Sequence, residues 1–182
     1  MVHTALLLVD LQKEWVKEDS ELYVGDIRDT IARIQRLIRS SREQGYKIVF
    51  TKHVEDETGG VFDPGSTNID LLDEVEVRTE DTIIEKHRIS PFFRTRLSEE
   101  LEGIGRIIVC GILTNLCVRS LIQDAYDRDF DIVAIKDCCV AFDEETQEFT
   151  FKDLQATREE LTIIDTEAFL SDIENQRTTP TD

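Results

Sequence analysis

The sequence predicts an α/β fold of three layers, in which a six-stranded parallel sheet lies between two layers of helices. Two observations predict it. Short apolar runs alternate along the chain with segments whose apolar residues recur every three to four positions, the patterns of buried strands and amphipathic helices. The strand runs are apolar on both faces, as in TALLLV at residues 4–9, which is typical of parallel strands covered on both sides. We therefore expect right-handed helical crossovers between the strands.

Six runs have the length and composition of strands: 4–9, 47–51, 81–85, 106–110, 131–135 and 161–164. The first and the fourth are the most apolar, so we expect them to be neighbours at the centre of the sheet. Helical patterns cover 26–44, 95–101, the stretch that follows Thr114 to about residue 128, 144–158 and 168–173. The pattern at 144–158 predicts that Phe149, Leu154 and Ala156 point inward.

The length of 182 residues suits one domain with a sizeable core. We expect a single domain over residues 1–174 and a disordered polar tail, NQRTTPTD, over 175–182. Residues 52–80 are the least regular stretch and contain three glycines and a proline. We expect this stretch to form loops beside a functional site.

The chain is strongly acidic, with 21 basic and 39 acidic residues and a net charge of −18. Such a surface repels nucleic acids and anionic membranes, and the sequence has no apolar run of membrane-spanning length. We therefore expect a small-molecule substrate and no nucleic-acid or membrane partner. Two explanations of this acidity stand side by side. The protein is adapted to a salt-rich cytoplasm, in which salt screens the repulsion between like charges, or it is an ordinary acidic protein of the cytosol.

The four cysteines, 110, 117, 138 and 139, are clustered late in the chain and do not resemble a disulfide framework. We interpret them as reduced thiols of a cytoplasmic protein, in agreement with an N-terminus that lacks the basic region of a signal peptide. Cys110 is expected in the core. Cys138 and Cys139 are expected just after the fifth strand, as packing residues with thiol pKa values near that of a free cysteine.

Three functional side chains end three predicted strands at one edge of the sheet: Asp10, Lys86 and Cys117. Ligands bind at this edge in open α/β sheets. Cys117 is expected in the first turn of a helix, where the helix dipole and Lys86 would lower the pKa of the thiol. The alternatives are a buried core cysteine and a strand-end ion pair of Asp10 with Lys86. No glycine-rich phosphate-binding motif is present.

Three motifs in this order, LLLVDLQKEW, EKHRISPFFRT and GILTNLCVRS, resemble those of the isochorismatase-like cysteine hydrolases over about residues 4–165. That family includes nicotinamidases, N-carbamoylsarcosine amidases and ureidoacrylate amidases. The resemblance implies a Rossmann-like topology and a catalytic triad of Asp10, Lys86 and the nucleophile Cys117. It also implies a cis peptide bond between Ile112 and Leu113, and an oxyanion hole formed by the backbone amides of Leu113 and Cys117.

The same resemblance implies that substrate is bound by Trp15, Phe93, Ile112 and Thr114. Nicotinamidases bind a divalent metal through an aspartate and histidines after the second strand. Here that stretch reads TKHVEDETGG, with His53 as its one histidine, so we expect neither a metal nor another cofactor. Members of the family are usually oligomeric, which predicts a homo-oligomer, either a dimer or a tetramer.

The sequence therefore predicts a cysteine hydrolase that cleaves a C–N bond of a small carboxamide or ureido compound through a thioester. One alternative is a vinyl ether hydrolase of the isochorismatase type, although isochorismatase itself lacks the nucleophilic cysteine. The others are a catalytically silent binding protein and a thiol redox protein on the same fold.

Overall fold

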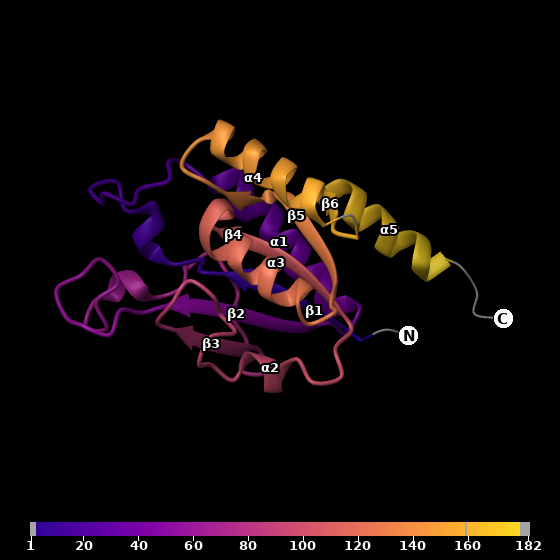
Figure 1. The fold of residues 1–182 in the computed structure, drawn as a ribbon, viewed down its shortest axis with the longest axis horizontal. Helices are drawn as coiled ribbons and strands as arrows, with labels where there is room; N and C mark the ends of the chain where they lie inside the picture. Colours follow the sequence, from indigo (N-terminus) through magenta and orange to yellow (C-terminus); the bar gives the residue numbers. More distant parts are fainter. Residues whose placement is uncertain (1–2, 159, 179–182) are drawn as a thin grey trace.

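A computed structural model describes residues 3–158 and 160–178 (Figure 1). Six strands form one parallel sheet in the order β3-β2-β1-β4-β5-β6. The prediction of a six-stranded parallel sheet, with the strands at Thr4 and Cys110 adjacent at its centre, is confirmed. The strands are β1 (Thr4–Val9), β2 (Lys47–His53), β3 (Thr82–Lys86), β4 (Arg106–Ile112), β5 (Asp131–Val140) and β6 (Thr162–Ile164).

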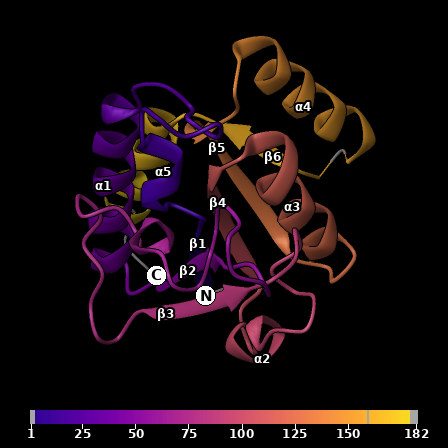
Figure 2. The same cartoon turned by 90° about the vertical axis from the view of Figure 1, so that its left-hand side faces the viewer.

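Helices cover both faces of the sheet. Figure 2 shows α1 and α5 on one side and α3 and α4 on the other. The helices are α1 (Arg28–Glu43), α2 (Leu97–Glu100), α3 (Arg119–Tyr126), α4 (Glu144–Thr157) and α5 (Thr166–Thr178). Three short turns complete the described elements: η1 (Lys13–Val16), η2 (Thr67–Ile69) and the π-helical η3 (Thr114–Val118).

The core follows from the apolar patterns of the sequence. Every residue of β1 is buried, because this strand has neighbours on both edges and helices on both faces. In α1 the side chains of Ile31, Ile34, Leu37 and Ile38 form one buried stripe at spacings of three and four residues. Gly45 follows the helix with a φ of +70°, the left-handed conformation that glycine adopts readily at a helix end.

The two central strands approach each other closely at Gly111, near the carboxyl end of β4. Gly111 has a φ of +130°, and a Cβ built on it would lie 2.1 Å from the carbonyl oxygen of Val9. Only glycine fits this position without displacing the end of β1. The close approach matters for function because Asp10 follows directly after Val9.

The fifth strand is longer than the sequence predicts. It continues to Val140, and its pairing with β4 shifts register between Val109 and Gly111. The polar pair Lys136 and Asp137 therefore marks an irregularity within the strand and not its end. Cys138 and Cys139 consequently lie inside β5 and are buried, so the prediction that they follow the strand is wrong.

Two predictions about the C-terminal helices also need correction. In α4 Leu154 is buried as expected, but Phe149 is 65% exposed and Ala156 is exposed, because Phe151 occupies the inward position instead. Helix α5 extends through residues 175–178, which were predicted to belong to a disordered tail. Residues 179–182 lie outside the described part of the chain.

Candidate active site

Asp10 lies directly after β1 and is fully buried. Its backbone has a φ of +48°, which turns the chain at the end of the strand. The Thr51 hydroxyl of neighbouring β2 accepts a hydrogen bond from the Asp10 backbone N–H (3.1 Å) and donates one to Asp10 Oδ1 (2.5 Å). Thr51 is itself fully buried. These two bonds fix the orientation of the Asp10 carboxylate.

Lys86 is the last residue of β3, and its long side chain is completely buried. Its Nζ lies 2.8 Å from Asp10 Oδ2. It also donates to the carbonyl oxygen of Arg88 (3.2 Å) and to Cys117 Sγ (3.4 Å). Burial lowers the pKa of Lys86, but the interactions with Asp10 and Cys117, above all the negative charge of Asp10, more than offset it, so the pKa is raised. The lysine is therefore an ammonium group at neutral pH.

Cys117 is held in η3, the turn between β4 and α3, with 5% of its surface exposed. The peptide bond between Ile112 and Leu113 is cis, as the family resemblance implies. The structure therefore brings together the three side chains that the sequence placed at one sheet edge. Cys117 lies in the first turn of a continuous helical run, as predicted, and this turn is the π-helical η3, which passes directly into α3.

The ionisation of Cys117 differs from the prediction. Burial, followed by the charge of the Asp10 carboxylate, raises the pKa of the Cys117 thiol to about 12. The positive charge of Lys86 lowers the pKa of this thiol, but by less than burial and Asp10 together raise it. The resting site therefore holds a neutral thiol next to a carboxylate–ammonium pair. In such a site the thiol needs a base when it attacks.

Cys138 and Cys139 also differ from the prediction of ordinary thiol pKa values, whereas Cys110 lies in the core as predicted. Burial raises the pKa of Cys138 to about 12 and raises those of Cys110 and Cys139. Each is enclosed in the sheet, and Cys138 Sγ is 3.1 Å from the Thr166 hydroxyl. All four cysteines are free and buried.

The residues expected to bind substrate lie in different surroundings. Ile112 is fully buried, Leu113 is 4% exposed, and the buried Thr114 hydroxyl donates to Gln147 Oε1 (2.6 Å). Phe93 is 50% exposed, with the Arg94 guanidinium 5.1 Å from its ring centre. Phe93 is thus half-exposed, whereas Asp10, Lys86 and Cys117 are buried.

Trp15 belongs to an aromatic group that sequence reasoning identified only in part. Its ring lies 5.3 Å from that of Phe62 and 6.4 Å from that of Phe142, between ring centres. Phe62 in turn meets the ring of His53 edge-on at 5.1 Å. Phe62 could not be predicted as part of this group, since it comes from the irregular 52–80 stretch.

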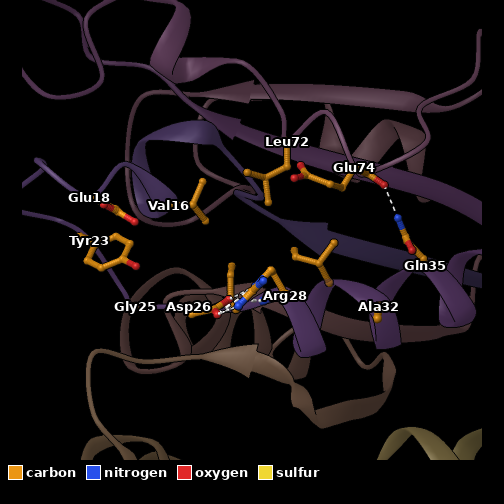
Figure 3. A pocket seen from close by; sticks show the side chains of 12 residues that line it. Val16, Glu18, Tyr23, Gly25, Asp26, Arg28, Ala32, Gln35, Leu72 and Glu74 are labelled. Atoms are coloured by element: carbon orange, nitrogen blue, oxygen red, sulfur yellow. Dashed lines mark hydrogen bonds and ion pairs between the residues drawn. The ribbon is translucent and has the colours of Figure 1, made fainter.

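A cleft of about 700 Å³ lies apart from the triad (Figure 3). It runs between η1, the start of α1 and the segment around Leu72, and Val16 and Leu72 form part of its wall. Asp10, Lys86 and Cys117 are absent from its lining. We therefore place the candidate site at the triad, where charge and nucleophile converge.

Within the described ranges, no three histidine, cysteine or acidic side chains are grouped so that they could hold a metal ion. Within the same ranges, the helices are too short or too polar for any of them to cross a membrane.

Comparison with known proteins places the chain in a family. The model of the isochorismatase domain matches residues 4–168. The chain belongs to the isochorismatase family. Among curated members of this family, it is 27% identical to the ureidoacrylate amidohydrolase RutB of Acinetobacter baylyi, over 75% of this chain and 70% of that protein. It is also 27% identical to Nicotinamidase 3 of Arabidopsis thaliana, over 82% of this chain and 79% of that protein.

Solved structures of this family share the fold. A cysteine hydrolase from Pseudomonas syringae pv. phaseolicola superposes with a TM-score of 0.87 at 22% identity, and the match covers 95% of this chain and 93% of that one. The isochorismatase fold thus positions the residues described above.

Proposed function

We propose that this isochorismatase-family protein hydrolyses a C–N bond of a small carboxamide or ureido compound, with Cys117 as the nucleophile. One observation carries the proposal: a buried chain of contacts joins Cys117 Sγ to Lys86 Nζ at 3.4 Å and Lys86 Nζ to Asp10 Oδ2 at 2.8 Å. The family membership and the relatives named as ureidoacrylate amidohydrolase and nicotinamidase support the same reaction class.

Asp10 is the base in this proposal. Its Oδ2 has no well-aligned hydrogen-bond donor among the described residues, although the Lys86 ammonium is close. As the Cys117 sulfur attacks the substrate carbonyl carbon, Asp10 takes the thiol proton. Asp10 then gives that proton to the leaving nitrogen, and ammonia or an amine departs. Water next attacks the thioester carbonyl, Asp10 accepts its proton, and the proton returns to the sulfur as the acid is released.

Lys86 is an electrostatic group in this mechanism. As an ammonium it cannot accept a proton, but its ion pair with Asp10 and its hydrogen bond to Cys117 hold both groups in place. Its positive charge stabilises the thiolate that forms during attack. The backbone amides of Leu113 and Cys117, at the two ends of the turn that follows β4, are the proposed donors to the substrate oxyanion.

Two competing functions are retained. A vinyl ether hydrolase of the isochorismatase type would not require Cys117, and a silent binding protein would require none of the three groups. The four free thiols favour a cytoplasmic location, and a homodimer or homotetramer remains our expectation for the assembly.

The test is release of ammonia from a panel of small carboxamides and ureido compounds by the parent protein, by Cys117→Ala and by Cys138→Ala. We expect turnover by the parent and by Cys138→Ala, and a loss of several orders of magnitude in Cys117→Ala. Equal turnover by parent and Cys117→Ala would refute the nucleophile. Turnover of vinyl ethers alone would establish the first competing function.

A further inference from the structure

His53 stands at the end of β2 beside the triad, and the mechanism above does not use it. Its backbone is held on both sides by the fully buried side chain of Gln12. The His53 N–H donates to Gln12 Oε1, and Gln12 Nε2 donates to the His53 carbonyl oxygen, both at 2.8 Å. Gln12 also donates to Ile69 O at 2.9 Å. The position of His53 relative to the sheet edge is therefore fixed.

The imidazole of His53 meets Lys86. His53 Nδ1 lies 3.4 Å from Lys86 Nζ, and Lys86 Nζ is in turn 3.4 Å from Cys117 Sγ. An ammonium group has no lone pair and can only donate. In this contact Nδ1 must be the acceptor, so the ring proton resides on Nε2. Lys86 thus selects the Nε2–H tautomer of a neutral histidine.

The Nε2 side of the ring is open to a ligand. His53 is partly exposed, Phe62 covers it edge-on, and no side chain or carbonyl within the described ranges bonds to Nε2. A hydrogen-bond donor of fixed orientation, Nε2–H, therefore lies across the ring from Nδ1, and Nδ1 is two contacts away from the nucleophilic sulfur through Lys86 Nζ. Such a donor contributes to selectivity, because a ligand that lacks the matching acceptor leaves it unpaired.

We propose that His53 is a specificity-determining residue whose Nε2–H binds a second acceptor oxygen of the substrate, beyond the scissile carbonyl. The substrate class is then narrower than carboxamides in general: carboxamides or ureido compounds that carry a carboxylate or carbonyl oxygen a few bonds from the reacting carbon. This inference rests on the proposed function for its catalytic consequence, but the tautomer and the ligand contact do not depend on turnover.

The charges around the ring agree with a neutral donor. Burial, and then the positive charge of Lys86, lowers the pKa of His53. Asp10 acts in the opposite direction, while His87 and Arg88 on the segment after β3 lower the pKa further. Arg88 and His87 are themselves paired with Asp56 on the loop after β2. The ring therefore stays unprotonated at neutral pH and can accept from Lys86.

The tautomer is tested by long-range ¹H–¹⁵N correlation spectra of ¹⁵N-histidine-labelled protein at pH 7, with His53 assigned from the spectrum of His53→Gln. We expect a neutral ring with its proton on Nε2. In Lys86→Met we expect a mixture of tautomers and a higher pKa. An Nδ1–H tautomer or an imidazolium in the parent would overturn the inference.

The ligand contact is tested with two probes of the same length, N-carbamoylglycine and N-ethylurea, in which a carboxylate of the first takes the place of a methyl group of the second. Added to Cys117→Ser, N-carbamoylglycine should shift the Nε2–H signal of His53 and N-ethylurea should not; equal responses, or none, would overturn the contact. In the parent, kcat/KM should favour N-carbamoylglycine, and His53→Phe should reduce that preference about tenfold or more, mainly through KM.

His53→Gln, which keeps an N–H donor, should retain part of the preference, and His87→Gln is the matched control that should retain all of it. An unchanged preference in His53→Phe would contradict the assignment. One further outcome separates the two proposals. If N-carbamoylglycine shifts the Nε2–H signal of His53 in Cys117→Ser but the parent shows no turnover, the proposed hydrolase activity is refuted and the His53 contact is supported.

Discussion

Asp10 Oδ2 lies 2.8 Å from Lys86 Nζ, and both side chains are completely buried. The pair joins the ends of β1 and β3, which are separated by β2 in the sheet. A buried charge without its partner is strongly unfavourable, so the two groups hold each other in the interior. Cys117 lies against this pair, and its ionisation is controlled by both charges.

Thr51 should be a positioning residue for Asp10. In Thr51→Val the hydroxyl that accepts from Asp10 N and donates to Asp10 Oδ1 is lost, while the volume is kept. Because misplacement of a catalytic group slows the reaction, we expect kcat to fall by about tenfold to a hundredfold. Thr51→Ser, which keeps the hydroxyl, should retain most of the activity. Equal kcat values for the two variants would show that these hydrogen bonds do not orient the base.

Gly111→Ala should destabilise the protein. The added Cβ would meet Val9 O at 2.1 Å and would also require an alanine at a φ of +130°, so we expect the free energy of unfolding to fall by about 3 kcal/mol. Gly103→Ala is the matched control, because Gly103 has a φ of +79° but open space around it. Conformational strain alone should cost it about 1–2 kcal/mol. Urea denaturation measures both, and equal losses would contradict the close approach.

Activity should survive chelation. The end of β2 and the loop that follows it contain one histidine, His53, and it faces Lys86, whose positive charge disfavours a nearby cation. Dialysis against EDTA should leave kcat/KM unchanged with any substrate found in the panel. Loss of turnover that zinc or manganese restores would show that residues after β2 hold a metal.

Much of the site could be predicted because its residues end strands. Apolar runs are local patterns, and parallel strands direct their carboxyl ends to one edge, so Asp10, Lys86 and Cys117 were expected together. The length of β5 was missed because the polar pair Lys136 and Asp137 interrupts its apolar run.

The ionisation state of Cys117 could not be predicted from local patterns in the sequence. Burial and the distance to Asp10 determine it, and neither is a local property of the sequence. The contacts of Thr51 with Asp10 and of His53 with Lys86 could not be predicted for a related reason, since each joins residues that are far apart in the sequence.

The measurement that tests the mechanism most directly is the rate of Cys117 alkylation by iodoacetamide between pH 6 and 9, mapped by mass spectrometry. The thiolate is the reacting form, and the Asp10 carboxylate contributes to the raised pKa of the thiol, after burial. Asp10→Asn removes that charge and leaves the Lys86 ammonium unopposed, so the thiol pKa should fall.

We therefore predict that Cys117 in Asp10→Asn is alkylated at least about tenfold faster than in the parent at pH 7, while turnover is lost because the base is missing. Asp73→Asn, an exposed carboxylate paired with Lys13, is the control and should match the parent in both assays. The contrary result is that Asp10→Asn keeps its turnover and that its Cys117 is alkylated at the same rate as in the parent. That result would contradict the assignment of Asp10 as the base that activates Cys117.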